Sequence, residues 1–136
     1  MTDRDANLGT NPAAGCLVAV VDDDESILRS LEYLLESADY AVRLFPSATA
    51  LLDGGRLASI DCVISDIDMP GTDGFELLRL IHAEREDLPV IFITGYPERL
   101  KTLSSLPGVA PRWFTKPFRA EDLLAAVGEA VRNSPR

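Results

Sequence analysis

Short runs of apolar residues alternate five times with segments of helical periodicity, and this alternation constrains the fold more than any other feature of the chain. The first run, 16–21, is continuous and rich in β-branched residues, which is typical of a strand buried on both faces of a sheet. The other predicted strands span 40–45, 61–65, 90–93 and 112–115. Such an alternation favours a parallel sheet with helices on both of its faces.

The helical segments carry apolar residues at three- and four-residue intervals, which predicts helices with one buried face. Ser47 is the expected N-cap of the second helix, and either Thr72 or Asp73 is the expected N-cap of the third. The predicted helices span 26–38, 48–52, 75–86, 97–106 and 119–131.

The length of 136 residues suits one compact domain that needs no metal or disulfide to hold its core. Gly, Asn, Pro and Thr occur without periodicity over 1–15, so we expect a disordered tail there. A single domain is then expected over 16–132, with a short tail over 133–136.

The composition excludes two classes of partner. The formal charge is −9, from 13 basic and 22 acidic residues, so the chain should repel nucleic acid and anionic membranes. No signal peptide and no apolar stretch of about 20 residues is present. Cys16 and Cys62 form no CxxC pair and are interpreted as buried thiols in a reducing compartment. We therefore expect a cytoplasmic protein.

Polar residues of a few specific kinds follow the predicted strands. In a parallel sheet, ligands bind beyond the carboxyl ends of the strands, so these side chains should converge. Crowded carboxylates repel one another, and Mg²⁺ with its preference for oxygen ligands would neutralise them. A lysine and a hydroxyl beside the cation would complete a pocket for a phosphoryl group. The residues concerned are Asp22, Asp23, Asp66, Asp68, Thr94 and Lys116.

Each of these residues also has a structural explanation. The acidic run Asp22–Glu25 has the composition of a helix N-cap, and Asp68 before Met-Pro-Gly has that of a turn residue. Thr94 or Lys116 alone would say little. The functional interpretation depends on the coincidence of the required residue types at the ends of different predicted strands.

The chain resembles the receiver domains of bacterial two-component response regulators. The resemblance covers 17 to about 131 and is strongest, in motif, to receivers that precede a DNA-binding helix-turn-helix domain. It implies a flavodoxin-like, doubly wound α/β fold with five parallel strands in the order 2-1-3-4-5 and five helices. The matching motifs are Val20-Val21-Asp22-Asp23, Ile64-Ser65-Asp66-Ile67-Asp68-Met69-Pro70, Ile93-Thr94-Gly95 and Trp113-Phe114-Thr115-Lys116-Pro117-Phe118.

The resemblance also implies a phosphorylation site. Asp66 would take a phosphoryl group from the phosphohistidine of a sensor histidine kinase or a histidine phosphotransfer protein, with Mg²⁺ as cofactor. Asp23 and Asp66 would bind the ion directly and Asp22 through water, and the backbone carbonyl of Asp68 would be a further ligand.

Other positions acquire roles from the same resemblance. Lys116 would pair with one phosphoryl oxygen and Thr94 would donate a hydrogen bond to another. Asp68 and Tyr96 flank the phosphoryl group and would tune the lifetime of the acyl phosphate. The peptide bond between Lys116 and Pro117 is expected to be cis.

The resemblance places the output of the domain on one face. Thr94 would shift on phosphorylation, together with the aromatic ring of Trp113. The face that changes is formed by the helix 97–106, the strand 112–115 and the helix 119–131, and a homodimer through this face is among the partners implied.

Two alternative functions remain open at the level of sequence. The Asp-x-Asp pair at Asp66 and Asp68 also occurs in phosphatases of the haloacid-dehalogenase class, which form an aspartyl phosphate. A degenerate receiver would serve only as a docking module. We expect no enzyme beyond a receiver that catalyses its own phosphorylation and dephosphorylation, either standing alone or cut from a longer regulator.

Overall fold

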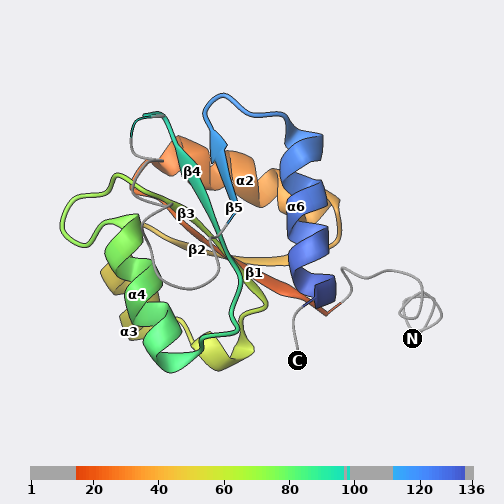
Figure 1. Ribbon diagram of the computed structural model, residues 1–136. Coiled ribbons are helices and arrows are strands. Elements are labelled where there is room, and N and C mark those ends of the chain that lie inside the picture. Colours follow the sequence, from red (N-terminus) through yellow and green to blue (C-terminus); the bar gives the residue numbers. More distant parts are fainter. Residues whose placement is uncertain (1–14, 97, 99–111, 134–136) are drawn as a thin grey trace.

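A five-stranded parallel sheet forms the centre of the molecule (Figure 1). The computed structural model describes residues 15–96, 98 and 112–133. The strand order is β2-β1-β3-β4-β5, and each neighbouring pair is parallel, which confirms the predicted topology. The strands are β1 (Leu17–Val21), β2 (Ala41–Phe45), β3 (Cys62–Asp66), β4 (Val90–Thr94) and β5 (Arg112–Thr115).

Helices cover both faces of the sheet, with α3 and α4 on one face and α2 and α6 on the other (Figure 1). The described part of the chain contains four α-helices, where five were predicted. The predicted helix 97–106 lies outside the described residues except for Glu98. The observed helices are α2 (Glu25–Ser37), α3 (Ala48–Gly54), α4 (Gly74–Glu84) and α6 (Ala120–Asn133), with a short 3₁₀ helix, η1 (Leu57–Ser59).

The core is divided into two layers by the sheet. Along β1, the side chains of Val18 and Val20 enter the layer under α2 and α6, and those of Ala19 and Val21 enter the layer under α3 and α4. Every residue of β3 and β4 is buried. Burial on both faces explains why these strands are continuous apolar runs and not alternating ones.

Side-chain caps fix where three helices begin. The Asp24 carboxylate accepts a hydrogen bond from the Ser26 amide at 2.9 Å and caps α2. Ser47 caps α3 as expected, and Asp73, the second of the two candidates, caps α4. The cap on α2 belongs to Asp24 alone, so Asp22 and Asp23 in the same acidic run are left for another role.

The ends of the chain fall mainly outside the described residues. Residues 1–14 and 134–136, which make up most of the two predicted tails, are not described. Helix α6 ends at Asn133, two residues beyond its predicted end. Among the described helices, none is both long and apolar enough to cross a membrane.

Candidate functional site

A cleft of about 380 Å³ lies at the carboxyl ends of the strands, where the sequence places its polar residues. The parallel arrangement brings together side chains that lie more than ninety residues apart in the chain, from Asp22 to Lys116. Thr94 lies at the adjoining end of β4. The residues that line the cleft are Asp22, Asp23, Asp24, Asp66, Asp68, Gly95, Tyr96 and Lys116.

Three of the carboxylates that line this cleft lie close together. Asp22, Asp23 and Asp66 each offer an oxygen, and these oxygens all lie within 4.8 Å of one another. The side chains of Asp22 and Asp66 are only 1% and 8% exposed, whereas Asp23 is exposed. Burial and the neighbouring Asp22 raise the pKa of Asp66 to about 6, and burial raises the pKa of Asp22 as well. The cluster therefore binds protons more tightly than isolated carboxylates do, and a cation would be stabilised there for the same reason.

The two carboxylate oxygens of Asp22 differ in their hydrogen bonding. Its Oδ1 accepts a hydrogen bond from the Asp24 amide at 2.9 Å. Its Oδ2 is buried and has no hydrogen-bond partner, which is a costly state for a carboxylate oxygen. A hard divalent cation such as Mg²⁺ prefers oxygen ligands of this kind. Asp22, Asp23 and Asp66 thus fit such an ion by their charge, their spacing and the unsatisfied oxygen.

Lys116 supplies the only described ammonium close to this cluster. Its Nζ lies 3.6 Å from Asp22 Oδ2 and 3.8 Å from Asp66 Oδ1. Its backbone amide donates to the Thr94 carbonyl at 2.8 Å, which holds the first residue after β5 against the end of β4. The Lys116-Pro117 peptide bond is cis, as expected. The ammonium approaches the Asp66 carboxylate from the end of β5.

Thr94 is fully buried at the end of β4. Its Oγ1 lies within donating distance of Asp68 Oδ2, at 3.3 Å, and of the Tyr96 carbonyl, at 3.4 Å. It also accepts a hydrogen bond from the Tyr96 amide at 3.0 Å. The structure therefore places Thr94 beside the cleft with its hydroxyl engaged by the loops after β3 and β4.

The two aromatic residues singled out by the sequence are both partly exposed. Tyr96 is 57% exposed at the mouth of the cleft, and Trp113 is 47% exposed on β5, opposite Phe92 of β4. Of the predicted output face, β5 and α6 are described, and the helix 97–106 is not.

Sequence reasoning did not identify Gly74, the first residue of α4, which packs against the backbone of Asp66 and Ile67. A Cβ atom at this position would lie 2.8 Å from the Asp66 carbonyl oxygen and 2.8 Å from Ile67 Cα. The Gly74 amide donates to the Ile67 carbonyl at 2.8 Å. Glycine is therefore needed so that the first turn of α4 can touch the backbone that carries Asp66. A Gly after an Asp N-cap is the signal that was present.

Gly74→Ala is expected to destabilise the fold by about 1–3 kcal/mol, because the added methyl meets backbone that cannot move freely. Gly54→Ala is the matched control, since a Cβ there has nothing within 4 Å. Urea unfolding of both variants measures the difference. Equal stability of the two variants would contradict the close packing at Gly74.

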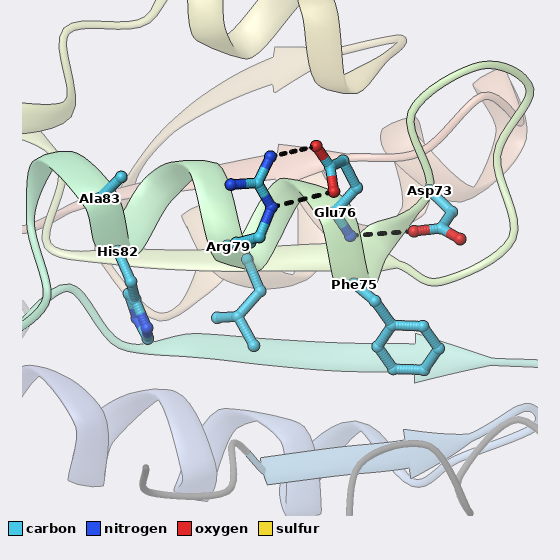
Figure 2. Close-up of a pocket in the computed structure, with 7 residues that line it drawn as sticks. Asp73, Phe75, Glu76, Arg79, His82 and Ala83 are labelled. Atoms are coloured by element: carbon cyan, nitrogen blue, oxygen red, sulfur yellow. Dashed lines mark hydrogen bonds and ion pairs between the residues drawn. The ribbon is translucent and has the colours of Figure 1, made fainter. Parts of the chain in front are cut away.

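A second and larger hollow, of about 630 Å³, lies along α4 (Figure 2). Its polar side chains are engaged within the protein. The Asp73 carboxylate accepts from the Glu76 amide, the Glu76 carboxylate pairs with Arg79 at 2.6 Å, and His82 Nε2 lies 3.0 Å from the Leu88 carbonyl oxygen. No charged group in this hollow is left unsatisfied as Asp22 is, so the smaller cleft is the better candidate site.

Comparison with known proteins agrees with this arrangement. Residues 18–128 match the family model of the response regulator receiver domain, a span that lies inside the predicted domain 16–132. The transcriptional regulatory protein FixJ of Bradyrhizobium diazoefficiens is 36% identical over 117 residues, which are 86% of this chain and 57% of that protein. The response regulator protein TmoT of Ectopseudomonas mendocina is 38% identical over 121 residues, 88% of this chain and 54% of that protein. The chain thus spans about half the length of these curated relatives.

Solved structures show the same fold. Full-length FixJ from B. japonicum superposes with a TM-score of 0.77 at 34% identity, over 90% of this chain and 60% of that chain. A response regulator receiver domain protein from Clostridium thermocellum superposes with a TM-score of 0.76 at 29% identity, over 86% of this chain and 94% of that one.

Proposed function

We propose that in this chain, which belongs to the response regulator receiver domain family, Asp66 is the residue that is phosphorylated. Membership of the family makes the chain a receiver module of two-component signalling. The matches give no support to the phosphatase alternative. What remains to be assigned is the part that each residue plays.

The observation that carries this assignment is the buried, unsatisfied Asp22 oxygen beside Asp66 and Lys116. A buried carboxylate pair keeps an incoming anion away unless positive charge is brought to it. Mg²⁺, held by Asp22, Asp23 and Asp66 with the Asp68 backbone carbonyl as a further proposed ligand, would supply that charge when bound. Lys116 already lies close to both buried carboxylates, Asp22 and Asp66, and supplies a further positive charge.

The proposed reaction is an in-line transfer. A carboxylate oxygen of Asp66 attacks the phosphorus of a phosphohistidine on a sensor histidine kinase or a histidine phosphotransfer protein. The new P–O bond forms as the P–N bond breaks, and the imidazole leaves with the electron pair and takes up a proton. Lys116 then neutralises a phosphoryl oxygen on the acyl phosphate, and Thr94 donates a hydrogen bond to another. Asp68 and Tyr96, at the cleft, would influence how quickly water reaches the acyl phosphate.

The proposed output passes through Thr94 to the Trp113 side of the sheet. FixJ is by name a transcriptional regulatory protein, so control of transcription by the phosphorylated receiver is the output we propose for this chain too. A dimer through the face that includes β5 and α6 is one way for it to act. Trp113 is partly exposed on β5, so the partner in such a dimer would have part of its side chain to cover.

Beryllofluoride with Mg²⁺, a stable mimic of the phosphoryl group, is expected to change the fluorescence of Trp113. Only groups that interact differently with the mimic can shift the balance between two states, and Thr94 is such a group. Trp113 is the only tryptophan, so the emission has one source.

Thr94→Ala is expected to blunt this change without abolishing binding of the mimic, whereas Thr49→Ala on the exposed surface of α3 should leave it intact. An emission spectrum that does not move at saturating mimic would contradict the coupling of Thr94 to Trp113.

A further inference from the structure

The side chain of Asp68 lies within hydrogen-bond distance of the Thr94 hydroxyl, at the edge of the candidate site. Ile67, just after β3, donates its amide to the Ile93 carbonyl at 3.1 Å, which extends the pairing of β3 with β4 by one step. Asp68 is the residue after Ile67, and Thr94 is the residue after Ile93. This register brings Asp68 Oδ2 to 3.3 Å from Thr94 Oγ1.

The Thr94 hydroxyl can serve only one acceptor at a time, because it carries one proton. The Tyr96 amide donates to Thr94 Oγ1 at 3.0 Å and so helps to fix its orientation. Two acceptors are then in range, the Asp68 carboxylate at 3.3 Å and the Tyr96 carbonyl at 3.4 Å. An ionised acceptor makes the stronger hydrogen bond, which favours Asp68.

We propose that Asp68 restrains the switch: its carboxylate holds the Thr94 hydroxyl in the unphosphorylated chain, and a phosphoryl group on Asp66 must compete for that proton. The inference rests on the proposed function of Asp66 and Thr94. Asp68 acts here as a positioning residue, through Thr94. A restraint that stabilises only the unphosphorylated state lowers the apparent affinity for a phosphoryl mimic.

A simpler effect of Asp68 has to be separated from this restraint. Asp68 is a negative charge that lines the cleft, so its removal also lessens repulsion of an anionic mimic. That electrostatic effect does not depend on the Thr94 hydroxyl. The restraint does depend on it, so a double-mutant cycle between the two residues distinguishes them.

The experiment measures the affinity of the intact chain for beryllofluoride at saturating Mg²⁺ by titration calorimetry. Asp68→Ala is expected to raise the affinity roughly threefold to thirtyfold in the wild-type background. In a Thr94→Val background only the electrostatic effect remains, so the same substitution should raise the affinity by a factor at least about threefold smaller than in the wild-type background. In a Thr94→Ser background, which keeps the hydroxyl, the increase should return. Asp68→Asn removes the charge but keeps an oxygen that can accept from the Thr94 hydroxyl, so its effect should depend less on that hydroxyl than the effect of Asp68→Ala does. Urea unfolding checks that each variant folds.

The outcomes separate the restraint from the function on which it rests. The same factor in the wild-type and Thr94→Val backgrounds would overturn the restraint and leave only charge repulsion. Failure of the wild-type chain to bind the mimic would overturn the proposed function as well. Loss of binding in Asp66→Asn, together with an Asp68 effect that requires the hydroxyl, is the result that supports both.

Discussion

Asp66→Asn is expected to abolish the phosphoryl adduct that the wild-type chain forms with acetyl phosphate and Mg²⁺. The substitution replaces an anionic nucleophile by a neutral amide of almost the same shape, so the cleft is kept and the attacking oxygen is lost. We expect the rate of adduct formation to fall at least about a hundredfold. Intact-mass spectrometry of both chains under identical conditions measures the change.

Asp53→Asn is the control for this experiment, because Asp53 is an exposed carboxylate on α3, away from the cleft. It should form the adduct at the wild-type rate. An adduct that persists in Asp66→Asn would show that another carboxylate accepts the group, with Asp22, Asp23, Asp24 and Asp68 as the other carboxylates that line the cleft.

Without Mg²⁺, the free energy of unfolding is expected to fall as the pH rises from 5 to 7. The folded chain raises the pKa of Asp66 from 3.8 to about 6, so it binds this proton more tightly than the unfolded chain does. The resulting stability is fully present below the unfolded pKa and is lost as the pH rises through about 6. The loss between these two pH values should be about 1 kcal/mol. Urea unfolding at the two pH values measures it, and Asp66→Asn should flatten the dependence.

Mg²⁺ is expected to reverse this loss by binding to the folded chain. A ligand at a hundred times its Kd adds about 2.7 kcal/mol, and the gain should be larger at pH 7 than at pH 5, where Asp66 is largely protonated. Asp23→Ala should reduce the gain, because it removes one of the three carboxylates proposed to hold the ion. Asp53→Ala, which removes an exposed carboxylate of α3, should leave the gain unchanged. A melting temperature that is indifferent to Mg²⁺ at tens of millimolar would count against the cation site.

The strands could be predicted from sequence because a buried parallel strand has few alternatives. The apolar runs that became β1, β3 and β4 are bounded by polar or turn residues, and their ends were predicted to within one residue. Helix ends depend on contacts with residues that are distant in the sequence. Helix α4 ends at Glu84, two residues early, where Arg85 turns and donates to the carbonyls of Leu57 and Ile60, both at 2.7 Å.

The composition of the site could be predicted for a similar reason. The carboxyl ends of parallel strands share one edge of the sheet, so the acidic, hydroxyl and lysine side chains had to converge there. Their detailed partners could not be predicted. Nothing in the run Asp22-Asp23-Asp24 shows that the third residue caps the helix and the first keeps an unsatisfied oxygen.

The hydrogen bond from Thr94 to Asp68 is also beyond sequence reasoning, because it depends on side-chain rotamers and on the register of β3 against β4. The requirement for glycine at Gly74 depends on how closely α4 approaches the Asp66 backbone. Both features depend on contacts of about 3 Å between atoms, and a residue pattern does not encode positions to that precision.

Phosphorylation of Asp66 is tested most directly by locating the phosphoryl group in the chain. Borohydride reduces an aspartyl phosphate to the alcohol homoserine, which leaves a stable mark at the residue that was phosphorylated. After incubation with acetyl phosphate and Mg²⁺, reduction and peptide mass mapping, homoserine is expected at position 66 alone among the acidic residues. Homoserine at Asp22, Asp23 or Asp68 in place of Asp66, or a chain that carries none, would contradict the assignment.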